Sequence, residues 1–319
     1  IKDLIRALEV AKDEDEPCVV HVVTKKGKGY EPAEEDFSGH WHGVSPFDVE
    51  TAKPLVEIPK NYKTYSQVVA DMVEHLMYGD DNIIAITPAM MAGSKLENIF
   101  AHFPDRSFDC GIAEEHAVTF AAGLALNGMH PFVSIYSSFL QRAYDQVNHD
   151  ICRMDLPVVF GIDRAGLVGD DGETHHGIFD ISFLRSLPNI ILAQGKDAKE
   201  IEDLIYTAFN QKHPFALRYP RGTSLYNGNT SSANEIKIGS WDYLLRHDNP
   251  IDEAMVDEIV KLNKTVYIYE SDMLIGGLSD AVGEYLVKTN QHLDMHVYAI
   301  DDIYPQQGTN SQIKEELKI

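Results

Sequence analysis

Residues 131–163 read PFVSIYSSFLQRAYDQVNHDICRMDLPVVFGID and contain one strand, one helix and a second strand, in that order. We predict the strands at Pro131–Ile135 and Pro157–Ile162, because both are short apolar runs. We predict the helix between them at Leu140–Ile151. Repeated units of this kind form a parallel sheet that is covered by helices on both faces. The stretch therefore predicts an α/β fold.

The same alternation extends to both sides of this unit. Further helices are expected at residues 1–11, 64–78, 113–126 and 201–209, and further strands at residues 18–23, 82–87 and 107–110. A last group has helices at 252–262 and 278–287 and strands at 265–270 and 295–300. A turn-rich stretch after Arg221, containing Gly222 and Gly228, precedes this last group and suits a linker.

The length of the chain favours more than one domain, because 319 residues exceed what one hydrophobic core usually supports. We predict three parts: residues 1–60 end a preceding domain and form a linker, residues 61–225 form the central α/β domain, and residues 226–319 form a smaller α/β domain. Because the chain begins in mid-pattern without a methionine, we expect a fragment or a processed chain.

The composition narrows the classes of partner. Fifty acidic residues against 27 basic residues give a net charge of −23, a field that repels nucleic acids and anionic membranes, so we expect binding to neither. An anionic ligand would have to be held by arginines clustered in a pocket. Cys18, Cys110 and Cys152 form no CxxC pair and indicate a reducing, cytoplasmic compartment. The apolar stretch 117–136 is interrupted by polar and turn-forming residues, which argues against a membrane span.

Three motifs permit an ordinary explanation when each is taken alone. Glu114 and Glu115 begin a helix, where the helix dipole stabilises acidic side chains. The glycines of KKGKGY (25–30) lack the spacing of a phosphate-binding P-loop and indicate a tight turn. Asp171 and His175 lie in a glycine-rich acidic loop, but this loop lacks the several oxygen ligands of a calcium site. We therefore predict no metal ligand on this chain.

Taken together, five segments resemble the 1-deoxy-D-xylulose-5-phosphate synthase family, in the family's order. They are KKGKGY (25–30), GIAEEHAV (111–118), IYSSFLQRAYDQ (135–146), DRAGLVGDDGETHHG (163–177) and RYPRG (218–222). The resemblance is to the C-terminal portion of these transketolase-like enzymes. It implies a thiamine-diphosphate-binding fold: residues 1–60 would be the tail of the diphosphate-binding domain, 61–225 the pyrimidine-binding domain, and 226–319 a transketolase-type C-terminal domain.

The resemblance also implies the reaction and the cofactor. Pyruvate and D-glyceraldehyde 3-phosphate would condense to 1-deoxy-D-xylulose 5-phosphate with loss of CO2, the first step of a route to isoprenoids. Glu114 matches the family glutamate that bonds a ring nitrogen of thiamine diphosphate and favours its imino form, which can deprotonate the thiazolium carbon. Phe139 matches the residue that packs on the pyrimidine ring. Tyr30 matches a residue beside the cofactor.

Other residues are implied at the substrates. His42 and His175 match histidines near the reacting atoms, and His42 is expected to assist proton transfer. The remaining substrate residues implied by the resemblance are Tyr136, Arg142, Arg164, Asp171, His175 and Arg221. Arginine suits this role because its planar fork matches phosphate and stays charged. The ligands of Mg2+ are expected upstream of this chain, and a homodimer is expected.

Two departures from the family leave alternatives open. The family's metal-binding motif is expected upstream of this sequence. A segment of about one strand–helix unit is expected to be missing near residues 240–251. Transketolases and the β-subunits of 2-oxoacid dehydrogenases share the domain order, although residues 163–177 argue against both. A non-catalytic fragment that only dimerises is a further alternative.

Overall fold

The computed structural model of the protein divides into two compact units, Ile1–Glu57 and Ile58–Ile319. It describes residues 1–36, 40–44, 46–55, 57–226, 228, 230–239, 253–262, 265–301 and 303–319. The segment that we predicted to be shortened, near residues 240–251, lies outside the described residues.

The first unit contains short helical segments and no described strand. Helix α1 (Lys2–Lys12) agrees with the prediction, and α2 (Glu31–Glu34) and a 3-10 turn (His40–His42) follow it. The strand predicted at residues 18–23 is wrong: this run is extended coil, and the Val19 side chain is 94% exposed. A β-strand needs a hydrogen-bonded neighbour, and no described residue of the chain pairs with this run.

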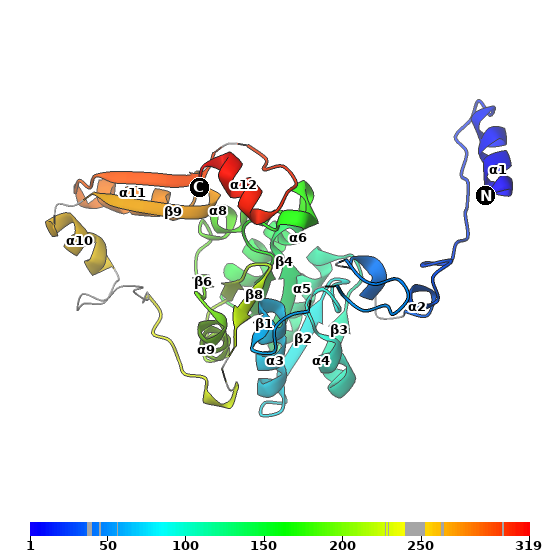
Figure 1. Cartoon of the computed structure of the whole chain (residues 1–319). Helices are drawn as coiled ribbons and strands as arrows, with labels where there is room; N and C mark the ends of the chain where they lie inside the picture. The colour runs from blue at the N-terminus through cyan, green and yellow to red at the C-terminus, as the bar shows by residue number, and fades with distance from the viewer. Residues whose placement is uncertain are drawn as a thin grey trace. The chain divides into compact units, whose positions relative to one another are not determined.

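The second unit is built on a parallel sheet of six strands, as Figure 1 shows. The strands lie in the order β3-β2-β4-β5-β7-β6. Their bounds are β2 Ile83–Thr87, β3 Ser107–Asp109, β4 His130–Tyr136, β5 Val159–Asp163, β6 Ile191–Gln194 and β7 Phe215–Arg218. Because all six strands are parallel, their carboxyl ends meet at one edge of the sheet.

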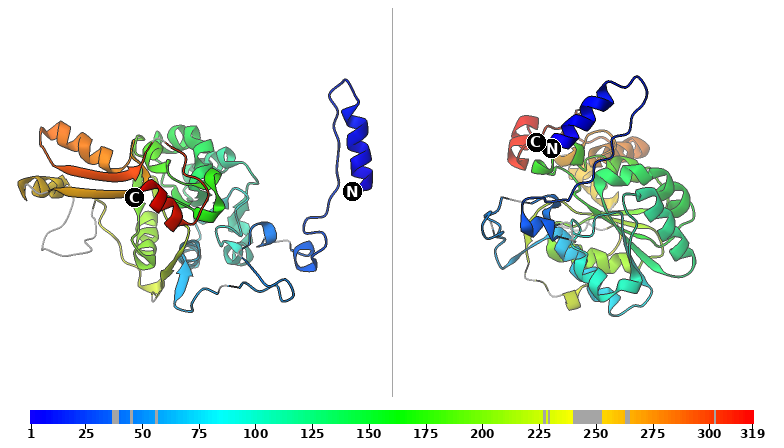
Figure 2. Two further views of the ribbon diagram at one scale, coloured as in Figure 1. Left: turned by 45° about the horizontal axis from the view of Figure 1, so that its top comes forward. Right: turned by 90° about the vertical axis from the view of Figure 1, so that its right-hand side faces the viewer.

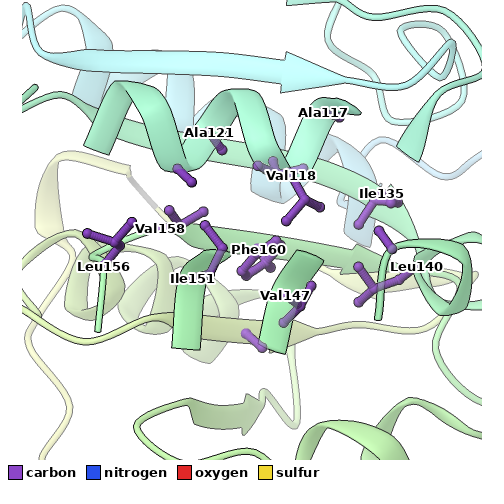
Figure 3. Close-up of a cluster of buried hydrophobic side chains, with 14 of the residues drawn as sticks. Ala117, Val118, Ala121, Ile135, Leu140, Val147, Ile151, Leu156, Val158 and Phe160 are labelled. Carbon is purple, nitrogen blue, oxygen red and sulfur yellow. The ribbon is translucent and has the colours of Figure 1, made fainter. Parts of the chain in front are cut away.

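Helices cover both faces of this sheet, and the alternation of side chains along each strand explains why. Phe132 of β4 packs with α3 (Tyr65–Met77) and α9 (Ala198–Phe209), whereas the next residue, Val133, packs with α5 (Glu114–Leu126). Figure 3 shows the second cluster, in which Ala117 and Val118 of α5 face Ile135 and Phe160. Strands buried on both faces are apolar at consecutive positions, and this is why they could be predicted.

The segment after β4 is helical but does not form the single helix predicted at Leu140–Ile151. It consists of α6 (Ser137–Leu140), a 3-10 turn (Gln141–Ala143), α7 (Tyr144–Gln146) and a π-helix (Val147–Cys152). Changes of helical winding of this kind redirect side chains and are frequent at functional sites. The apolar spacing alone does not reveal them.

A smaller C-terminal group of elements packs on the same unit. Strands β9 (Val266–Met273) and β10 (Met295–Ile300) pair in parallel, with α10 (Glu253–Leu262), α11 (Leu278–Thr289) and α12 (Asn310–Leu317) around them. Figure 2 shows α11 running alongside both strands. Residues Thr223–Leu225, which we assigned to the start of a linker, instead form β8 and pair with β1 (Tyr62–Thr64).

A buried ion network joins this C-terminal group to the six-stranded sheet. Arg218, the last residue of β7, donates two hydrogen bonds to Asp180 at 2.9 and 3.0 Å. It also donates two to Asp272 of β9, at 2.6 and 3.2 Å. All three residues are at most 4% exposed. Removing one partner from such a network leaves an uncompensated buried charge.

We predict that Arg218→Met lowers the free energy of unfolding by about 3–5 kcal/mol, because Asp180 and Asp272 lose their counter-charge. Urea unfolding followed by circular dichroism measures this loss. Arg185→Met is the control: Arg185 pairs with Glu284 of α11, whose side chain is 69% exposed, and should cost less than about 1 kcal/mol. Similar small losses for both variants would contradict the structural role of Arg218.

Candidate functional site

The carboxyl edge of the six-stranded sheet gathers most of the predicted site residues. Tyr136 is the last residue of β4, Arg164 directly follows β5, and Arg221 lies three residues after β7. In α/β sheets, ligands bind outside the carboxyl ends of the strands. These three strands are adjacent in the sheet, so their loops meet at one place.

Glu114 is a buried carboxylate beside this edge. It is the first residue of α5 and is 2% exposed, whereas the neighbouring Glu115 is exposed. One carboxylate oxygen, Oε1, accepts a hydrogen bond from Nη1 of Arg142. Within the described part of the chain, the other oxygen has no hydrogen-bond partner. The side chain of Arg142 is 48% exposed, so Glu114 has a counter-charge that can move and an oxygen that can accept another donor.

Aromatic rings lie next to Arg142, the partner of this carboxylate. The rings of Phe139 and Tyr136 stack with centroids 5.4 Å apart, and His175 meets Phe139 edge-on at 5.5 Å. The Arg142 guanidinium lies 5.0 Å from the centroid of the Phe139 ring. Burial raises the pKa of Tyr136 well above its usual value, which keeps its hydroxyl protonated. These contacts make an aromatic wall that a flat heterocycle could pack against.

Two arginines converge on Asp171. Its Oδ2 atom is 3.2 Å from Nε of Arg221 and 3.9 Å from Nε of Arg164. Arg221 also donates to the carbonyl oxygen of Val168 at 3.3 Å. Arg164 also pairs with Asp163 at 2.9 Å, so two carboxylates balance the charge of the two arginines. Such an arginine pair can bind a phosphate or carboxylate group.

The loop that holds Asp171 and His175 is supported from behind. Buried His176 accepts a hydrogen bond from the Val168 backbone nitrogen at 3.1 Å. Gln307, just before α12, donates to the carbonyl oxygen of Asp170 at 3.2 Å. The C-terminal residues therefore help to shape this loop, a contribution that no sequence motif indicated.

The structure thus brings together eight of the predicted residues: Glu114, Tyr136, Phe139, Arg142, Arg164, Asp171, His175 and Arg221. Tyr30 and His42, the other two predicted residues, belong to the first unit and are described by themselves. There Tyr30 packs on Trp41 at 5.1 Å, and His42 lies 3.3 Å from Lys26 Nζ.

Two further observations concern the described residues alone. Among the described residues, no three His, Cys, Asp or Glu side chains are grouped so that they could hold a metal ion. None of the described helices has the length and apolar character needed to cross a membrane.

Sequence reasoning assigned no role to the groups that hold Arg164. Its Nη1 atom donates to Asp163, to Ser66 and to the backbone oxygen of Gly93, at 2.9, 3.0 and 3.2 Å. Asp163 lies in a quoted motif, but Ser66 and Gly93 lie in segments that carried no signal.

Comparisons with known proteins identify the family of the chain. A family model described as the transketolase pyrimidine-binding domain matches residues 61–225. The 1-deoxy-D-xylulose-5-phosphate synthase of Listeria welshimeri is 44% identical over 94% of this chain and 53% of its own length. That of Listeria monocytogenes is 42% identical over the whole chain and 58% of its length. The chain therefore spans little more than half of these relatives.

The alignment with the Listeria monocytogenes protein extends over 357 positions, whereas this chain has 319 residues. The relative therefore carries at least 38 residues without a counterpart inside the aligned region.

Solved structures support the fold. A split-gene transketolase, described as an inactive β4 tetramer, aligns with a TM-score of 0.68 at 21% identity, over 80% of this chain and 93% of its own. The transketolase of Campylobacter jejuni aligns with a TM-score of 0.58 at 16% identity, over 82% of this chain and 46% of its own. The predicted α/β, transketolase-like fold is confirmed. The chain belongs to the family of transketolase pyrimidine-binding domains, and its relatives at 42–44% identity are 1-deoxy-D-xylulose-5-phosphate synthases.

Proposed function

We propose that this chain is the C-terminal part of a 1-deoxy-D-xylulose-5-phosphate synthase. The enzyme would join pyruvate to D-glyceraldehyde 3-phosphate, with cleavage of the pyruvate carboxyl bond, loss of CO2 and formation of one carbon–carbon bond. The observation that carries the proposal is the buried carboxylate of Glu114, whose partner Arg142 also lies over the Phe139 ring. The 42–44% identity to enzymes of this name supports it.

The residues present fit the pyrimidine end of thiamine diphosphate. Glu114 offers one unpartnered carboxylate oxygen to a ring nitrogen, and Phe139 offers an aromatic face. Tyr30, whose buried hydroxyl has no hydrogen-bond partner among the described residues, is assigned to the same cofactor. When bound, the cofactor supplies a nucleophilic carbon and an electron sink. The protein's part is to orient the ring and to hold the proton that Glu114 shares with it.

The remaining residues are assigned to the substrates. Arg164 and Arg221 would bind the phosphate of the acceptor, and Tyr136 and Asp171 its hydroxyl groups. Arg142 would bind substrate once it leaves Glu114. His175 and His42 would hold or move protons near the reacting carbonyl.

The rest of the enzyme would lie outside this chain. We assign residues 1–60 to the end of a diphosphate-binding domain, residues 61–225 to the pyrimidine-binding domain and residues 226–319 to a shortened C-terminal domain. The Mg2+ ligands belong to the preceding portion. The 38 residues present in the aligned relative are about the size of one strand–helix unit. We further propose a cytoplasmic homodimer.

One alternative has an observation in its favour. Because the chain spans 53–58% of its relatives, it could be a fragment that dimerises without catalysis. The intact mass of the purified protein, followed by turnover of both substrates with thiamine diphosphate and Mg2+, separates the two. A mass near 35.8 kDa without CO2 release favours the fragment. Formation of deoxyxylulose phosphate establishes the synthase.

We predict that Glu114→Gln abolishes turnover, with a loss of at least about 100-fold, because an amide cannot share the proton that general acid–base catalysis needs. Exchange of the thiazolium C2 proton of thiamine diphosphate, followed by NMR, should fall in parallel. The matched control is Glu115→Gln, which changes an exposed neighbour in the same helical turn and should leave both rates unchanged. Equal effects of the two substitutions would rule out the assigned role.

We predict that Arg164→Met and Arg221→Met each raise the KM for glyceraldehyde 3-phosphate by about 10- to 150-fold. This range corresponds to about 1.5–3 kcal/mol for a charged hydrogen bond. The KM for pyruvate should stay nearly constant, because the two arginines are assigned to the phosphate group. Steady-state kinetics with each substrate varied in turn measures both values, and Arg185→Met serves as a distant control. A rise in the KM for pyruvate alone would reassign the two arginines.

A further inference from the structure

The support of Arg164 differs from that of Arg221. Arg221 has a side chain that is 38% exposed, and its neighbours are a backbone oxygen and Asp171. The side chain of Arg164 is 17% exposed and is held from behind by groups on three separate segments.

Asp163 and Ser66 form the centre of this support. Asp163 ends β5 and is completely buried. Its Oδ1 atom accepts from the backbone nitrogen of Arg164 at 2.7 Å. Its Oδ2 atom accepts from Ser66 Oγ at 2.7 Å and from Arg164 Nη1 at 2.9 Å. Ser66 lies in the first turn of α3 and also accepts from Arg164 Nη1, at 3.0 Å. Asp163 thus binds both the backbone nitrogen and the guanidinium of Arg164.

The backbone of Arg164 needs this support. Its φ angle is +58°, a left-handed conformation that side chains other than those of glycine, asparagine and aspartate rarely adopt. The bond from the Arg164 nitrogen to Asp163 stabilises this conformation at the end of β5. It directs the side chain across the Tyr136 ring, whose centroid lies 4.4 Å from the guanidinium carbon.

The groups that hold the Arg164 side chain bind only one nitrogen of its guanidinium, Nη1. All three acceptors share this donor. Nε is buried, makes no hydrogen bond with a described residue, and faces Asp171 across 3.9 Å. A buried charged nitrogen without an acceptor is costly. Nη2 makes no hydrogen bond with a described residue and is not among the buried atoms, so it is the nitrogen that an incoming oxygen acceptor can reach.

We propose that Asp163 and Ser66 are positioning residues that hold Arg164 so that its free edge selects a phosphorylated acceptor. The proposal rests on the function proposed above for Arg164. A guanidinium held in advance loses little conformational freedom when the phosphate binds, so the supports increase affinity without touching the ligand. Their effect should appear with the phosphorylated acceptor and be absent with an acceptor that lacks the phosphate.

The test compares kcat/KM for D-glyceraldehyde 3-phosphate and for unphosphorylated D-glyceraldehyde in the same holoenzyme. Ser66→Ala removes one hydroxyl from a buried helix and should lower kcat/KM for the phosphorylated acceptor by about tenfold. The value for D-glyceraldehyde should remain within about twofold. The matched control is Ser94→Ala, because Ser94 is equally buried but its hydroxyl has no hydrogen-bond partner; it should change neither value.

Asp163→Asn supplies a second variant, which keeps the shape of the side chain and removes its charge. It should lower kcat/KM for D-glyceraldehyde 3-phosphate relative to kcat/KM for D-glyceraldehyde. The melting temperature of the variant shows whether the protein is folded. In an Arg164→Met background, Ser66→Ala should cause no further loss for the phosphorylated acceptor.

The outcomes separate this proposal from the function on which it rests. Equal losses with both acceptors, or no loss with either, would overturn the positioning role while Arg164→Met still impairs only the phosphorylated acceptor. If Arg164→Met itself leaves that acceptor unaffected, or the wild-type holoenzyme has no synthase activity, the proposed function fails, and the positioning role fails with it.

Discussion

The buried guanidinium of Arg218 is the constraint on which the functional edge of the sheet depends. It ends β7, three residues before Arg221, and it binds Asp180 at the start of helix α8 (Asp180–Leu184). The loop that carries Asp171 and His175 runs from β5 to that helix. Arg218 therefore fixes the far end of this loop and the start of the segment that carries Arg221. Its bonds to Asp272 extend the same constraint to the C-terminal strands.

A second buried ion pair works at the near end of the same loop. Asp163 and Arg164 pair at the end of β5 with Ser66 beside them. Each buried charge is costly to remove from water, and each is tolerated here because its partners make several hydrogen bonds with it. The two pairs bracket a loop of otherwise flexible composition, with positive φ angles at Gly166, Gly169 and Gly172. Rigid ends thus compensate for a sequence that would adopt many conformations by itself.

The sequence allowed the central fold to be predicted where strands are buried on both faces, as at Ile83–Thr87 and His130–Tyr136. It did not reveal β6 and β7, which have only four residues each, and β7 ends in a charged arginine. The strand predicted at residues 18–23 was wrong because a strand must pair with a second strand, and the spacing of apolar residues does not show whether that partner exists. The candidate site residues were predicted from family motifs. Their supports were not, since Ser66 and Asp163 are 97 residues apart in sequence and meet only in the folded sheet.

The C-terminal strands differ from the central sheet because one of their faces carries exposed aromatic side chains. Along β9, Tyr267 and Tyr269 point to one face and are 56% and 67% exposed, whereas Glu270 on the other face is buried. These two tyrosines stack on His296 and Tyr298 of β10, with centroids 5.0 and 4.5 Å apart. Parallel strands are normally covered on both faces. Cross-strand stacking partly compensates by burying ring against ring, but it leaves the outer side of each ring in water. The central sheet, covered on both faces, has no such exposed aromatic rows among its described strands.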